Sequence, residues 1–234
     1  MDTSFPNIDD IKKIKDNLVN ELAALKNNSE ELDSAIRTIS NITEWKYSRG
    51  VFYTPEQFFN ELLEESPGKP LQKKYISPLE ARRNGAESAG FIDDRLVLTI
   101  DSEKQEPELV RLTANLISYK DSEIFIRRTH HYDFTDKPSK KPELVSLTTI
   151  KRLSENLEVS VGIFTRGDYG FKVFSFNENN LVNHIYVLGS RHQSTIRYDL
   201  HYMDDEKVES ITTKGRDGEP DITIWKNAQT NHSR

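Results

Sequence analysis

The second half of the sequence alternates short aromatic or β-branched segments with turn-forming residues, and this alternation most narrows what the chain can fold into. The separators are rich in Gly, Asn and Asp, which favour tight turns, and they stand at 166–168, 177–180, 204–206 and 215–220. Connections this short force neighbouring strands to run antiparallel. We therefore predict a twisted meander of about six strands, at 159–165, 171–176, 182–188, 195–202, 208–213 and 222–225.

Two hairpins of this region share one loose pattern. The first reads FSFNENNLVNHIYVLG (174–189) and the second LHYMDDEKVESITTKG (200–215). In each, an aromatic strand leads into an acidic or amide-rich turn, and a Val, an Ile and a Gly follow at the same spacing. We interpret each copy as one hairpin, repeated because each repeat buries its apolar face against its neighbour.

The strand at 195–202 can be assigned by face, because successive side chains in a strand point to opposite sides. One set should cover a core and consists of Ile196, Tyr198, Leu200 and Tyr202. The other set forms a charged ridge of Arg197, Asp199 and His201. A sheet with helices on only one side would leave such a face open to water or to a partner.

The middle of the chain also favours strands. Alternation at 110–116 and 124–126, around a turn at 120–123, predicts an antiparallel hairpin, and 96–100 adds a third strand. A helix over 108–116 is the alternative. Ile150, Leu153 and Leu157 stand at helical spacing, so we predict a short helix over 148–157.

The N-terminal quarter has a helical period. Apolar residues recur every seven positions and form one stripe on a helix, at Ile11, Leu18, Leu25, Leu32 and Ile39. An Asn-Asn-Ser break at 27–29 favours two antiparallel helices of about 18 and about 13 residues, with one helix of about 33 residues as the alternative. The stripe either packs on its own domain, which we favour, or dimerises the protein as a coiled coil through residues 8–42.

Two capping boxes follow. Thr54-Pro55-Glu56-Gln57 predicts a short helix through about residue 64, and Ser77-Pro78-Leu79-Glu80 predicts a brief helix that ends near residue 85. A strand or hairpin is expected within 44–53. The fold class is therefore α+β, with a helical region at 1–65, a connector with a short helix at 66–90 and an antiparallel β-rich domain at 91–234. One continuous domain is the alternative.

The composition of the chain argues against several functions and kinds of site. The net charge of −6 argues against general binding to nucleic acid and permits a basic protein partner. Because the chain has no cysteine, disulfides, thiolate zinc sites, iron–sulfur clusters and a cysteine nucleophile are excluded. We find neither the start of a signal peptide nor an apolar run long enough to span a membrane, and we expect a cytoplasmic protein that does not enter the membrane.

Few residues suggest chemistry. Phosphate-binding glycine loops, the GxSxG elbow, the HExxH helix and the EF-hand loop are all missing. Imidazole and carboxylate ligands at His131 and Asp133 could share a metal ion, and Arg197, Asp199 and His201 could form an acid–base row. Solvated or edge-strand residues and a polar sheet face are commoner explanations. We therefore expect no enzyme, no catalytic residue, no metal site and no cofactor.

The two hairpins resemble the aromatic–turn–aliphatic β-hairpin repeats of some bacterial antitoxin and immunity proteins, over residues 174–215 of the 234. They are similar, more distantly, to the Tyr/Asp repeats of large bacterial surface toxins, although the Gly-rich form of those repeats is absent. The first resemblance implies a cytosolic protein that binds and blocks a toxin domain. Its expected partner-binding residues are Arg197, Asp199, His201, Asp204, Asp205 and Glu206. An adaptor that oligomerises through its N-terminal helices, and an enzyme with a pocket in the β-domain, are the alternatives.

Overall fold

The structure is a computed structural model that describes residues 8–26, 28–101, 112–131, 141–190, 194–215 and 219–227. These residues form one 13-stranded sheet in which every pairing is antiparallel. From β3 to β13 the strands lie in chain order, and β1 then β2 complete the edge beside β3. The strands are β1 (Glu44–Arg49), β2 (Lys69–Leu71), β3 (Glu87–Ile92), β4 (Arg95–Ile100), β5 (Leu112–Lys120), β6 (Glu123–His131), β7 (Glu143–Ser154), β8 (Leu157–Phe164), β9 (Tyr169–Phe176), β10 (Val182–Gly189), β11 (Ile196–Tyr202), β12 (Val208–Thr213) and β13 (Ile222–Lys226).

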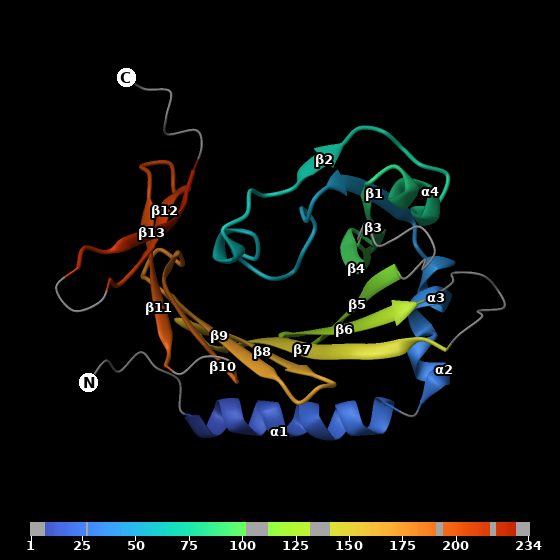
Figure 1. The fold of residues 1–234 in the computed structure, drawn as a ribbon, viewed down its shortest axis with the longest axis horizontal. Helices are drawn as coiled ribbons and strands as arrows, with labels where there is room; N and C mark the ends of the chain where they lie inside the picture. The colour runs from blue at the N-terminus through green and yellow to red at the C-terminus, as the bar shows by residue number, and fades with distance from the viewer. Residues whose placement is uncertain are drawn as a thin grey trace.

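The helices of the described residues are few and mostly N-terminal: α1 (Ile8–Leu25), α2 (Ser29–Leu32), α3 (Ser34–Ile39), α4 (Pro78–Arg83) and the 3₁₀ turn η1 (Glu61–Leu63). The predicted break at residues 27–29 is confirmed, and the second predicted helix is divided into α2 and α3. The predicted antiparallel arrangement is wrong, because α2 and α3 turn steeply away from the axis of α1 (Figure 1). The capped helix at 78–83 is also confirmed, since the Ser77 hydroxyl accepts a hydrogen bond from the backbone N–H of Glu80 at 3.2 Å.

The sheet bends into an open trough with α1 lying outside it (Figure 1). We call the side that α1 packs against the outer face. There Ile11, Leu18 and Leu25 of α1 bury against strand residues that include Val161 and Val173. The apolar stripe of α1 is therefore buried against the sheet of its own chain. Farther along the same face, Ala35 of α3 packs on β4 and β5.

The opposite side, which we call the inner face, holds a second core made by β9 to β13. Its fully buried members are Phe174, Ile185 and Ile211. A long connection between β1 and β2, residues 50–68, runs inside the trough (Figure 1), and we call it the inner loop. Two of its side chains, Phe58 and Leu62, pack against this core.

The helix predicted from residue 55 to about 64 is wrong, because only η1 forms there. Phe58 has φ 53°, a left-handed backbone conformation that interrupts a right-handed helix. The Thr54 hydroxyl accepts from the N–H of Glu56 at 3.2 Å, so it closes a local turn rather than capping a helix. Packing of the inner loop on the sheet has overridden a good local signal.

The helix predicted over 148–157 is also wrong. Residues 148–154 belong to β7, which pairs with β6 on one side and with β8 on the other, and Leu157 already begins β8. Ile150 and Leu153 satisfy a helical spacing by coincidence, and the two ladders of sheet hydrogen bonds decide the conformation. The six C-terminal strands, the 120–123 turn and the strand at 96–100 are confirmed.

The molecule is a sheet meander with N-terminal helices, as predicted, but β structure dominates and a balanced α+β label does not fit it well. The predicted helical region at 1–65 contributes β1, which lies between β2 and β3 in the same sheet. None of the helices in the described residues combines the length and the apolar character needed to cross a bilayer.

Candidate functional site: a polar network on the outer face

Register places the predicted ridge on the outer face. In antiparallel strands, residues directly opposite each other share a face. Val173, which packs under α1, lies opposite Tyr186, and Tyr186 lies opposite Arg197. Asp199 lies opposite His184 in the same ladder. The ridge of β11 therefore continues the helix-covered face.

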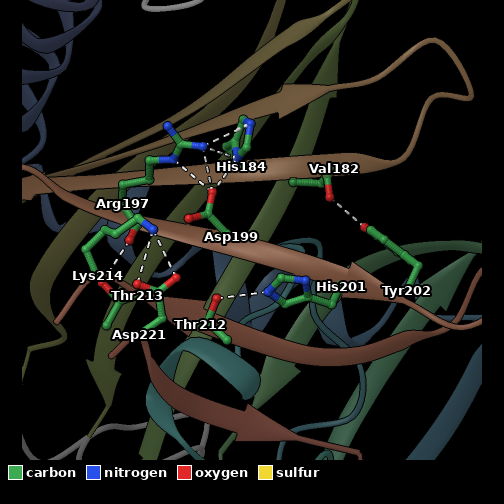
Figure 2. A network of polar contacts seen from close by, with 10 residues as sticks. All are labelled: Val182, His184, Arg197, Asp199, His201, Tyr202, Thr212, Thr213, Lys214 and Asp221. Atoms are coloured by element: carbon green, nitrogen blue, oxygen red, sulfur yellow. Dashed lines mark hydrogen bonds and ion pairs between the residues drawn. The ribbon is translucent and has the colours of Figure 1, made fainter. Parts of the chain in front are cut away.

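Two neighbouring side chains converge on the carboxylate of Asp199 (Figure 2). Its Oδ1 lies 2.7 Å from Nδ1 of His184 and 2.8 Å from both Nε and Nη2 of Arg197. Because a carboxylate only accepts, Nδ1 of His184 carries the proton. The Nη2 of Arg197 lies 3.1 Å from Nδ1 and 3.3 Å from Nε2 of the same ring. Each member of the trio therefore contacts the other two.

Further hydrogen bonds hold the strands around this trio (Figure 2). His201 Nε2 lies 2.9 Å from the hydroxyl of Thr212, and the Thr213 hydroxyl donates to the carbonyl of Arg197 at 2.9 Å. Tyr202 donates to the carbonyl of Val182 at 2.7 Å. These contacts tie β10, β11 and β12 together, so the network sits on a fixed platform.

The trio is partly accessible. The side chains of His184, Asp199 and Arg197 are 27%, 19% and 41% exposed. A charged group that is partly withdrawn from water and already oriented can recognise a partner with little further ordering. The aromatic ring of Tyr186 lies 6.0 Å from the Arg197 guanidinium and adds an apolar element to the same patch.

The arrangement of the trio is poorly suited to acid–base catalysis. Acid–base catalysis would need a nucleophile hydrogen-bonded to the His184 ring, whereas the ring contacts Arg197 Nη2, which lies 3.1 Å from Nδ1 and 3.3 Å from Nε2. Ser175 is the residue opposite His184 on β9, yet no hydrogen bond joins the two among the described residues. Charge pairing and recognition are the chemistry that this geometry favours.

No family model, curated protein or solved structure matches the chain. The inference of function therefore depends on the residues of the network and their surroundings.

The predicted acidic turn lies at one end of the same β11–β12 hairpin. Asp204, Asp205 and Glu206 are exposed, and Glu206 takes a left-handed backbone conformation at φ 61°. Lys207 donates to Asp205 at 2.5 Å, and this hydrogen bond lowers the pKa of the Asp205 carboxyl below its ordinary value. The structure gives these residues no contact with the Asp199 trio, so the six predicted residues form a ridge and a separate turn.

The adjacent histidines of β6 point to opposite faces, as the strand pattern predicts. His130 Nδ1 lies 3.2 Å from the Thr113 hydroxyl, whereas His131 Nε2 lies 2.8 Å from the hydroxyl of Thr129. Burial lowers the pKa of His131 to about 4, although the negative charge of Asp33 acts to raise it. Asp133 lies outside the described residues, within which no cluster suited to a metal ion occurs.

A second polar group, absent from the sequence predictions, lies around Asp101 at the other end of the sheet. Asp101 pairs with Arg128 at 3.1 Å, and its Oδ1 accepts from Asn115 at 3.4 Å. Burial raises the pKa of Glu87 to about 7, helped by the negative charges of Asp101 and Glu65. A carboxyl with this pKa changes charge near neutrality.

Sequence reasoning found Arg197 and Asp199 but missed His184. The signal was available, because counting outward from the β10–β11 turn in an antiparallel hairpin brings residues 184 and 199 close together. The cluster around Asp101 left no such signal, since its members come from separate strands and a loop.

Proposed function

We propose that this protein binds another protein through the outer face of β10 to β12. The observation that carries the proposal is the position of the Asp199 trio. On the outer face, α1 packs mainly on β7 and β8, its core reaches Tyr186 and Leu188 of β10, and α3 packs on β4 and β5. The side chains of the trio are 19% to 41% exposed among the described residues, so these residues leave the network partly uncovered.

The network is suited to recognition because its members are held before any partner arrives. Preorganised side chains lose little conformational freedom on binding, and this reduces the free-energy cost of association. Arg197 and Tyr186 also belong to the residue types enriched at interface hot spots. Lys214 and Asp221, paired at 3.0 Å near the end of β12, extend the patch with further charges.

The partner class is an inference from charge. The chain carries a net charge of −6, and the exposed turn at Asp204 to Glu206 adds acidic groups at the end of the same hairpin. A basic protein would approach this region faster through electrostatic steering. We propose a cytoplasmic immunity-type role, in which the partner is a toxin domain whose activity is blocked by direct binding.

The alternatives fit the geometry less well. An adaptor assembled through residues 8–42 would need an apolar stripe, but Ile11, Leu18 and Leu25 are already buried against the chain's own sheet. An enzyme based on the Asp199 trio would need a nucleophile hydrogen-bonded to His184, and Ser175, the residue opposite it, makes no such bond among the described residues. Protein binding requires neither.

The test is a differential capture experiment from extracts of the native cell. The wild-type chain, Asp199→Lys and Glu30→Lys are immobilised and the retained proteins are quantified by mass spectrometry. Glu30 lies exposed on α2, and its substitution makes the same change of charge away from β10 to β12. The proposal expects a protein that is retained by wild type and Glu30→Lys and lost with Asp199→Lys. If every retained protein behaves alike on the two variants, the proposal is wrong.

The toxin role has its own outcome. If the captured partner is a toxin, adding the wild-type chain in equimolar amount should abolish the partner's activity, and Asp199→Lys should fail to do so at the same concentration. A partner whose activity continues unchanged in the 1:1 complex would leave binding in place and remove the inhibitory role.

A further inference from the structure

The inner loop is a compact unit that is attached at a narrow neck. Its two ends meet where Arg49 pairs with Lys69, and the N–H of Gly68 donates to the carbonyl of Val51 at 3.0 Å. Side chains are excluded from this neck, because a Cβ on Gly68 would lie 2.4 Å from the carbonyl oxygen of Gly50. Loops longer than about 12–15 residues with little secondary structure of their own are uncommon and are often functional.

The backbone–backbone hydrogen bonds of the inner loop stay within the loop. Within the described part of the chain, its backbone–backbone hydrogen bonds all join two of its own residues, such as Leu62 to Phe58 at 3.0 Å and Glu65 to Asn60 at 2.9 Å. The Asn60 side chain donates to the carbonyl of Val51 at 2.9 Å and stiffens the loop further. The loop can therefore leave the sheet without losing a backbone hydrogen bond to it.

Several side-chain contacts hold the loop down, among them the ring of Tyr53 against Phe91 of β3 at 5.7 Å and the ring of Phe59 beneath Lys172 at 5.7 Å. Glu56 pairs with Lys172 of β9 at 2.6 Å, and Gln57 donates to Glu158 of β8 at 3.2 Å. Phe58 and Leu62 cover the apolar core of β9 to β13. Burial beneath this contact raises the pKa of the Glu158 carboxyl.

One backbone conformation in the loop carries a cost. Phe58 reaches the core from a left-handed conformation at φ 53°. Such conformations are unfavourable for bulky side chains and persist only where surrounding contacts enforce them. A bound segment with the same side chains and an unstrained backbone would compete with the loop.

We propose that the inner loop is a detachable lid, and that the floor beneath it binds a peptide segment that presents the loop's own chemistry. That chemistry is an acidic residue for Lys172, an aromatic residue two positions later and an aliphatic residue four positions after that, as Glu56, Phe58 and Leu62 display it. This site lies on the inner face, so it is independent of the outer network.

The absence of cysteine from the chain allows a direct test on the full-length protein. Single cysteines are placed at Ile211, in the floor core, and at Val161, beneath α1, two strand positions that are each 0% exposed. Their reaction with a thiol reagent is followed at increasing urea concentrations. Local opening of the lid predicts that Ile211→Cys reacts about tenfold faster or more than Val161→Cys, with a weaker dependence on urea. Equal rates with equal urea dependence would mean that the loop opens only on global unfolding, and would overturn the proposal.

The ligand chemistry is tested on the same Ile211→Cys protein. A synthetic peptide with the sequence of residues 51–67 is added in excess. The proposal expects the peptide to slow the labelling of Ile211→Cys severalfold, and expects no slowing by the same peptide carrying Phe58→Ala. If neither peptide changes the rate although the site opens, the lid stands and the proposed ligand is wrong.

Discussion

His184 and Asp199 face each other across the β10–β11 ladder with 2.7 Å between Nδ1 and Oδ1, and Arg197 closes the third side. The contact joins two strands on the part of the outer face that lies beyond α1. It supplies both a local stabilising interaction and a preformed charged patch, and these two roles can be separated by mutation.

The stabilising role predicts a modest cost for Asp199→Asn. The neutral amide loses the charge-assisted hydrogen bonds to His184 and Arg197, so we expect a fall of about 1 kcal/mol in the free energy of unfolding. Urea denaturation followed by circular dichroism measures it. Asp221→Asn, which removes only an exposed pair with Lys214, is the control and should cost less than about 0.5 kcal/mol. Equal effects of the two substitutions would show that the trio adds nothing beyond an ordinary surface pair.

The packing of α1 predicts opposite outcomes for two neighbouring residues. Leu18 is 3% exposed and lies in the outer-face core, whereas Val19 is 45% exposed. We expect Leu18→Ala to lower the free energy of unfolding by about 2–4 kcal/mol through lost burial and a residual cavity. Val19→Ala should change it by less than about 0.5 kcal/mol. A small effect of Leu18→Ala in chemical denaturation would contradict the docking of α1 on β7 and β8.

Glu87 predicts an unusual dependence of stability on pH. Its pKa in the folded chain, about 7, lies above the ordinary value of 4.5, so the folded state binds this proton more tightly than the unfolded state. The contribution of Glu87 to the free energy of unfolding therefore falls as the pH rises from about 4.5 to about 7. In thermal unfolding, the stability of Glu87→Gln relative to the wild type should be greater at pH 8 than at pH 5.

The comparison must be made as a difference between variants, because His131 acts in the opposite direction. Its pKa is lowered from 6.5 to about 4, so its contribution to stability is lost as the pH falls through that window. Glu87→Gln leaves His131 in place, and the His131 term cancels in the difference. A pH-independent gap between wild type and Glu87→Gln would contradict the raised pKa.

The neck of the inner loop predicts that the loop can be removed. Deleting residues 51–67 joins Gly50 to Gly68 and leaves a two-residue Gly-Gly turn between the paired residues Arg49 and Lys69, a favoured hairpin connection. We expect the strand signal in far-UV circular dichroism to persist. The emission of Trp225, which packs in the core beneath the loop, should shift to the red in a Trp45→Phe background. Collapse of the strand signal would show that the loop is an integral part of the sheet.

Local sequence patterns predicted part of this fold, and contacts between distant residues decided the rest. Strands 159–225 were predictable because turn residues and period-two alternation recur there with short spacing, and the face of β11 followed from the same alternation. The helices predicted at 55–64 and 148–157 failed because sheet pairing and contacts with distant strands outweigh local capping and periodicity.

Two of the three residues of the Asp199 trio were predictable in the same way. Arg197 and Asp199 stand on one strand, so their shared face follows from spacing alone, whereas His184 required the hairpin register. The pairing of Asp101 with Arg128, and the crossing of the inner loop to Lys172, depend on how far the sheet bends. Neither feature has a local sequence signature.

The most direct test of the central claim is the affinity of the purified partner for three versions of this chain, measured by isothermal titration calorimetry. The account predicts that Asp199→Lys weakens binding about 30-fold or more, as expected for a hot-spot charge, while Glu30→Lys stays within about threefold of the wild type. Equal affinities for wild type and Asp199→Lys, with both proteins folded, would show that the partner binds elsewhere and would contradict the account.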